Sequence, residues 1–165
     1  MHSVIQRLVS ALAIAPLALA CSSDDGGGSG GGGGNVPDAC TLLTAGEIED
    51  ILGAPTPGVA ATNDTPGGTS RRCAWEREYS TVLRNDELVL SVAPVAAYTP
   101  LVGSTPYTIG DGGEVLDQTR GVQITWKKAA FAVTFRYAIT GALSEDFEPY
   151  RVKAKALAQA ANDRL

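Results

Sequence analysis

A glycine-rich stretch near the N-terminus limits what this 165-residue chain can fold into. Residues 22–35 contain glycine, serine, aspartate and asparagine but no apolar side chain. Such a segment cannot bury enough surface to offset the entropy of ordering it, so we expect a disordered tether. Residues 36–165 then fold as a single domain. A chain of that length buries about two-thirds of its unfolded surface, which is enough for one hydrophobic core.

The segment before the tether has the features of an export signal. Residues 1–7 carry a short positive region, and a mostly apolar stretch continues to Ala20. That stretch is too short to span a bilayer, and Pro16 suits a signal peptide better than an anchor. We therefore expect residues 1–20 to be a signal peptide. A buried N-terminal helix is the alternative, which the glycine tract directly after it disfavours.

The apolar stretch ends at residues 17–21 with Leu-Ala-Leu-Ala-Cys. This ending resembles the lipobox of bacterial lipoproteins, in which a cysteine is lipidated and becomes the mature N-terminus. The resemblance implies that Cys21 carries several acyl chains such as palmitate, which is what stable anchoring to a bacterial membrane requires. Residues 21–35 would then hold the domain on the periplasmic or cell-surface side. An ordinary secreted protein cleaved near Ala20 is the alternative.

Two cysteines remain once Cys21 is assigned to the lipid. Exported proteins generally pair such cysteines, so we expect a disulfide between Cys40 and Cys73. The bond would tie the first helix to the first strand. Two unpaired buried thiols are the alternative.

Composition excludes several kinds of chemistry. The one histidine is His2, inside the expected signal peptide, so the mature chain lacks the side chain that most often activates serine or cysteine nucleophiles. The formal net charge is −5 without a basic block, which argues against nucleic acid as a partner. We expect no catalytic residues, no metal site and no cofactor, and therefore no enzyme.

The first helix of the domain is marked at both ends. Thr44 and Glu47 have the spacing of a capping box, and Gly53 is a suitable helix stop. These signals predict a helix over residues 45–52.

Alternating apolar and polar residues predict four or five strands. Residues 53–70 and 98–113 show no such pattern and are expected to be loops, and Asn85-Asp86 is expected to be a turn. The expected strands cover residues 73–79, 88–92, 114–116, 122–126 and 131–137, with a hairpin at 127–130. Most of the aromatic residues fall in the last two strands and are expected in or near the core: Trp126, Phe131, Phe135 and Tyr137.

The last element is an amphipathic helix with Ser144 as a possible cap and Pro149 in its first turn. Its apolar face is mostly alanine, which packs closely on a sheet and inserts poorly into lipid, so we expect it on the sheet rather than on a membrane. The order of elements predicts an α+β fold. This would be a two-layer domain with one antiparallel sheet of four to five strands and an N-terminal and a C-terminal helix packed on it.

Several blocks of the domain resemble the small exported lipoproteins of uncharacterised function that are common in actinobacteria. The main block is Asp-Ala-Cys-Thr-Leu-Leu-Thr at residues 38–44, followed by Cys73-Ala74-Trp75 and a glycine-rich turn at residues 109–114. The resemblance spans most of residues 38–165. It implies no reaction and no catalytic residues.

Three carboxylates within seven residues, Asp111, Glu114 and Asp117, form the densest acidic group. A hard cation such as Ca²⁺ accepts oxygen ligands, but the spacing is not that of an EF-hand, and a solvated turn is the favoured interpretation. Two basic pairs are interpreted as surface charge rather than anion sites: Arg71-Arg72 and Lys127-Lys128.

These observations favour a cell-envelope lipoprotein with a non-catalytic binding or accessory role. Its partner would be another envelope protein or a small apolar ligand. The long loops at residues 53–70 and 96–113 are candidates for recognition, although they are also compatible with tolerated insertions. A hydrolase or transferase that uses carboxylates alone is the alternative function.

Overall fold

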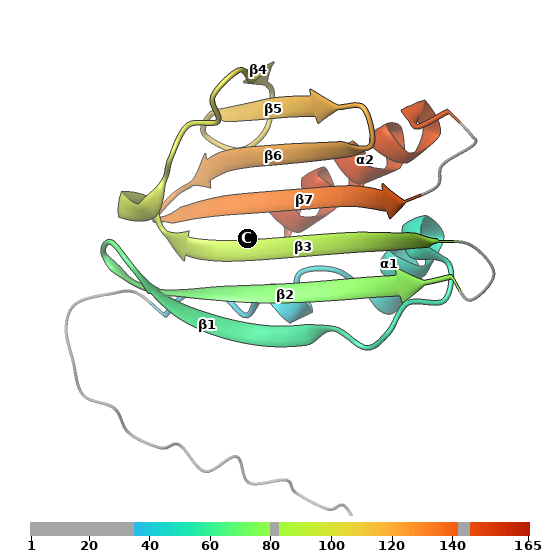
Figure 1. Cartoon of the computed structure of the whole chain (residues 1–165). Coiled ribbons are helices and arrows are strands. Elements are labelled where there is room, and N and C mark those ends of the chain that lie inside the picture. The colour runs from blue at the N-terminus through green and yellow to red at the C-terminus, as the bar shows by residue number, and fades with distance from the viewer. Residues whose placement is uncertain (1–34, 80–82, 142–145) are drawn as a thin grey trace, which may run out of the picture. The chain divides into compact units, whose positions relative to one another are not determined.

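One antiparallel sheet of seven strands dominates the part of the chain that the computed structural model describes, residues 35–79, 83–141 and 146–165. The strand order is β1-β2-β3-β7-β6-β5-β4, and every pairing is antiparallel. Figure 1 shows helices α1 and α2 on one face of this sheet, which makes a two-layer α+β domain. The strands are β1 (Val59–Thr65), β2 (Gly68–Glu78), β3 (Arg84–Pro94), β4 (Thr105–Tyr107), β5 (Gly113–Gln118), β6 (Gly121–Lys128) and β7 (Phe131–Gly141), and the helices are η1 (Ala39–Thr41), α1 (Ala45–Leu52), η2 (Val95–Ala97) and α2 (Glu148–Asp163).

Four of the sequence predictions concern residues outside the described ones: the signal peptide at 1–20, the lipidated Cys21, the tether up to residue 34 and the cap Ser144. Among the described residues, no helix combines the length and the apolar character needed to cross a bilayer.

Helix α1 begins and ends where its capping signals predict. The Thr44 hydroxyl accepts a hydrogen bond from the Glu47 N–H, and the Glu47 carboxylate accepts one from the Thr44 N–H, at 3.4 and 2.8 Å. At the other end Gly53 adopts φ +80°, a conformation that side chains disfavour. The guanidinium of Arg77 donates to the Leu52 carbonyl at 2.6 Å, so β2 also satisfies the end of the helix.

The hydrophobic core lies between the sheet and the helices. Trp126, Phe135 and Tyr137 are completely buried, and Phe131 is partly buried against them, as predicted. Helix α2 packs on β6 and β7 through alanines that have no exposed surface: Ala154, Ala158 and Ala161. Their small side chains allow the helix to approach the sheet closely, which confirms that this helix packs on the sheet.

The prediction of four to five strands is wrong, because the two edge strands, β1 and β4, do not show the alternation of apolar and polar residues from which strands were predicted. Strand β1 lies inside the expected loop at residues 53–70, and its residues are exposed or half-buried on both faces. Strand β4 is three residues long and contains Pro106. Period-two patterning arises only where one face of a strand is buried, so neither strand leaves that signal in the sequence.

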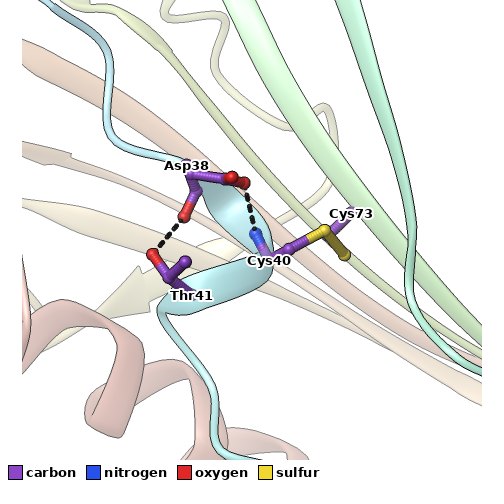
Figure 2. Close-up of a disulfide and its surroundings, with 4 residues drawn as sticks. All are labelled: Asp38, Cys40, Thr41 and Cys73. Atoms are coloured by element: carbon purple, nitrogen blue, oxygen red, sulfur yellow. Dashed lines mark hydrogen bonds between the residues drawn. A yellow bond between two sulfur atoms is a disulfide. The ribbon is translucent and has the colours of Figure 1, made fainter. Parts of the chain in front are cut away.

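The predicted disulfide joins Cys40 to Cys73, with their Cα atoms 5.0 Å apart. Figure 2 shows how the short helix η1 presents Cys40: the Asp38 carboxylate accepts from the Cys40 N–H at 2.9 Å, and the Asp38 carbonyl accepts from the Thr41 hydroxyl at 2.8 Å. Cys73 is completely buried in β2. The bond therefore fastens the segment before α1 to an inner strand of the sheet.

Breaking this bond should lower the free energy of unfolding by about 3–4 kcal/mol, because it frees a loop of 33 residues in the unfolded chain. Urea denaturation of the wild type with and without reductant measures the change. The double variant Cys40→Ser/Cys73→Ser is the control, since its midpoint should not respond to reductant. Equal midpoints for oxidised and reduced wild type would contradict the prediction.

The two helices are joined by an ion pair between Glu47 and Arg164. The Arg164 guanidinium donates to both carboxylate oxygens of Glu47 at 2.8 Å and to the Leu42 carbonyl at 2.7 Å. The hydrogen bond from Arg164, followed by those from Thr44, lowers the pKa of Glu47 to about 2. The ionised carboxylate is thus a shared contact of the α1 N-terminus and the α2 C-terminus.

A carboxylate whose pKa is lowered by folding stabilises the protein above its unfolded pKa, and the contribution disappears as pH falls through the folded pKa. The Glu47 contribution should therefore disappear between about pH 5 and pH 2. Glu47→Gln should flatten the loss of thermal stability over that range. Glu49→Gln, on the exposed side of the same helix, serves as control and should leave the pH profile of the wild type intact.

Candidate functional site

The face of the sheet opposite the helices carries a groove of about 340 Å³. Strands β3, β6 and β7 form its floor, and residues 97–101, which begin at the last residue of η2, form its wall. The floor residues alternate along their strands with core residues, which places them on the open face. They are Ser91, Ala93, Gln123, Thr125, Ala132 and Thr134.

A row of hydroxyl groups crosses the floor. Ser91 is paired with Thr134, and Thr134 with Thr125, so the three side chains are neighbours on adjacent strands. The Thr125 hydroxyl is nearly buried, donates to the Val133 carbonyl at 3.0 Å and lies 3.5 Å from the Thr134 hydroxyl. In the described part of the chain the Ser91 hydroxyl and the Gln123 amide have no hydrogen-bond partner. They remain available to a molecule in the groove.

Glu114 holds the wall in place. It lies beside Thr125 in the sheet, and its carboxylate accepts from the Leu101 N–H at 2.8 Å and from the Ser104 hydroxyl at 3.1 Å. Tyr98 is part of the wall, and the ammonium group of Lys127, from β6, lies 4.8 Å from the centre of its ring. Burial, together with the charge of Glu114 and a hydrogen bond to it, raises the pKa of Tyr98. The phenol therefore stays neutral at physiological pH.

The lining of the groove is uncharged and combines polar side chains with small apolar ones, together with Pro100 and Leu101. Hydroxyl and amide groups alternate with alanines, and Tyr98 provides one aromatic ring. Such groups donate and accept hydrogen bonds without compensating charge, which suits a neutral ligand that carries hydroxyl or amide groups. The volume is at the lower end of the range for small-molecule sites, which begins at about 300 Å³.

A second, smaller cavity of about 260 Å³ lies between α1 and the sheet. Its lining is mainly apolar and includes Ile48 from α1, Pro55 and Pro57 from the following loop, and Trp75 from β2. The loop approaches Trp75 closely at Gly58, where a Cβ atom would lie 2.4 Å from the indole nitrogen. This cavity is where a small apolar ligand would fit.

The acidic group singled out in the sequence is dispersed in the structure. The Asp111 carboxylate accepts from the Ala129 N–H at 2.6 Å, whereas Asp117 forms ion pairs with Arg151 and Lys155 at 3.2 and 3.0 Å. With Glu114 bound to the groove wall, each of the three carboxylates has separate partners. Within the described residues, no group of three or more acidic, cysteine or histidine side chains is placed to hold a metal ion.

The basic pairs also differ from their expected positions. Arg71-Arg72 lies within β2 rather than before the first strand, and Arg72 pairs with Glu87 at 3.5 Å. Lys127-Lys128 ends β6, and Lys127 covers one face of Tyr98. One residue of each pair, Arg72 and Lys127, thus contributes to the open face.

A buried charge cluster was missed because Asn85-Asp86 reads as a turn, whereas it lies in β3. Asp86 has no exposed surface, and its carboxylate accepts two hydrogen bonds from Arg84, both at 2.7 Å. The hydroxyls of Tyr79 and Tyr137 add bonds of 3.1 and 3.3 Å. Burial and the neighbouring carboxylate raise the pKa values of both phenols. Four donor hydrogen bonds satisfy this carboxylate, so it is a structural ion pair.

Removing this carboxylate should destabilise the domain strongly. Asp86→Ala removes the carboxylate to which the Arg84 guanidinium and the Tyr79 and Tyr137 hydroxyls donate, and we expect the free energy of unfolding to fall by about 3–5 kcal/mol. The double variant Asp86→Leu/Arg84→Met should recover part of this loss. Glu87→Ala, on the exposed face of the same strand, is the control and should cost about 1 kcal/mol or less. Equal effects of Asp86→Ala and Glu87→Ala in urea denaturation would contradict the assignment.

The floor of the groove has a weak signal in the sequence. Its residues are the small and polar partners in the alternation of three strands, but alternation does not indicate which exposed face will be covered by a loop. The wall, at residues 97–101, carries no pattern of its own.

Comparisons of the chain with protein-family models, with curated proteins and with solved structures give no match.

Proposed function

We propose that this chain is an exported, membrane-anchored lipoprotein whose domain binds a small neutral ligand in the open-face groove and does not catalyse a reaction. The observation that carries the proposal is the groove itself, with its row of hydroxyls on three strands and a wall tied down by Glu114. Sites of this construction hold a ligand by several directed hydrogen bonds on a rigid floor.

The ligand class follows from the lining. Hydroxyl and amide groups beside one aromatic ring suit a saccharide or another polyhydroxyl compound, and the uncharged walls offer nothing to offset the desolvation of a charged one. A small apolar ligand in the cavity beside Trp75 is the second candidate, because that cavity is lined mainly by apolar side chains.

The anchor is supported by the sequence. The apolar stretch before Cys21, the lipobox-like ending and the glycine-rich tether together favour lipidation. Mass spectrometry of the membrane fraction tests it directly, since the N-terminal peptide should carry a diacylated or triacylated Cys21. A soluble protein with a free Cys21 would overturn this part of the proposal and leave the groove untouched.

Binding can be tested with Thr134, at the centre of the hydroxyl row. The probes are N-acetylglucosamine and cellobiose as neutral saccharides, glucuronate as a charged one, and N-phenyl-1-naphthylamine as an apolar one. We expect the neutral saccharides to shift the NMR signals of groove residues and Thr134→Leu to weaken this binding about tenfold or more, because it removes a hydroxyl and fills the groove.

Two controls accompany this test. Thr134→Ser keeps the hydroxyl and should retain binding, and Ala138→Leu adds bulk on the same face of the same strand but outside the groove. Binding of the apolar probe alone, with shifts confined to Trp75 and its neighbours, would favour the second cavity. Saturable turnover of an ester, glycoside or peptide that Glu114→Gln abolishes would support the carboxylate hydrolase instead.

A further inference from the structure

The two edges of the sheet are built differently. Strand β4 is three residues long and contains Pro106, which cannot donate a backbone hydrogen bond. Such features discourage the addition of another strand. Strand β1 is seven residues long and contains no proline or lysine, and its one charged residue is Asp64. Figure 1 shows it as the last strand on its side of the sheet. Only the β4 edge therefore has features that discourage another strand from pairing with it.

The outward side of β1 offers a regular row of backbone groups. Thr65 and Gly68 flank the two-residue loop between β1 and β2 and form a hydrogen-bonded pair. Because the bonding direction alternates along an antiparallel strand, Ala60, Thr62 and Asp64 turn their N–H and C=O groups away from β2. Within the described residues no strand lies on this side of β1, so these groups can pair with another strand, and the side chains around them are exposed or half-buried.

We propose that β1 pairs with β1 of a second copy of this chain, antiparallel and centred on Thr62. In this register Thr62 faces Thr62, and Ala60 faces Asp64 on each side of the two-fold axis. The three outward-turned residues then supply about six hydrogen bonds across the pair. Asp64 faces a small neutral residue rather than its own copy, so the pairing avoids the like-charge contact that destabilises adjacent strands.

The remaining pairs fit equally well. Ala61 faces Asn63, and Val59 faces Thr65, so small or uncharged polar residues meet throughout the strand. The symmetry axis is perpendicular to the sheet, and such an axis leaves the helices of both copies on the same side. The two sheets then form one continuous sheet, and the open faces with their grooves share the other side. Self-complementarity of this kind selects a second copy over an unrelated peptide.

Cysteine cross-linking of the full-length chain in bacterial membranes tests the pairing. Hydrogen-bonded pairs in antiparallel strands have Cα atoms about 5.5 Å apart, which is within disulfide range. Thr62→Cys should therefore give a reducible dimer on mild oxidation. Thr105→Cys, at the opposite edge of the sheet, is the matched control and should remain monomeric. A monomer with Thr62→Cys, at a melting temperature equal to the wild type, would overturn the proposal.

Charge variants test the register in the chain without added cysteines. Ala60→Lys places a cation opposite Asp64 and should lower the dimer dissociation constant of the detergent-solubilised full chain about fivefold, while Ala60→Asp should raise it about fivefold. Ala54→Lys and Ala54→Asp make the same net-charge changes at an exposed position outside the strand and should have no effect. Equal effects at positions 54 and 60, a sedimentation profile of monomers alone, or cross-links only to other proteins would overturn the proposal.

Discussion

In the described part of the chain, α1 and α2 cover one face of the seven-stranded sheet, and this one-sided burial decides which residues the inner strands carry on each face. On the covered face the inner strands place large apolar side chains such as Trp126 and Phe135 without exposed surface. On the other face the same strands carry alanine, serine, threonine and paired charges, because those side chains remain in contact with water or with a single loop. The groove follows from a core that has one side, because its floor is the uncovered face of the inner strands.

Charged side chains in this domain mainly hold segments together. Glu114 fastens the groove wall, Asp111 receives the backbone of the β6–β7 turn, and Asp86 satisfies Arg84 and two phenols inside the core. Glu47 joins the two helices through Arg164. Because these carboxylates already have partners, the groove is left with hydroxyl and amide groups. Its neutral chemistry is thus a consequence of how the fold uses its charges.

Local signals in the sequence were sufficient to predict the elements in which they occur. The capping box and Gly53 located α1 to the residue, the alternation around Trp126 and Tyr137 located β6 and β7, and the cysteine count located the disulfide. Edge strands β1 and β4 were missed because exposure on both faces removes the alternation. Asp86 was misplaced because its partners meet it only once β3 has formed: Arg84 lies two residues earlier on the same strand, and Tyr137 comes from the neighbouring strand β7. The groove could not be predicted, because it is formed by three strands and a loop that come together only in the folded domain, and no local sequence pattern specifies that arrangement.

The position of the disulfide has a mechanical consequence. The covalent loop between Cys40 and Cys73 encloses α1 and β1. A pulling force applied to the chain before Cys40 passes through the sulfur atoms directly into β2, so neither α1 nor β1 lies in the path of the load. From β2 the force passes to the inner strand β3, where hydrogen bonds along the two strands resist it together. A domain held by its N-terminus can therefore be dragged through its surroundings without peeling off its first helix or disturbing its free edge.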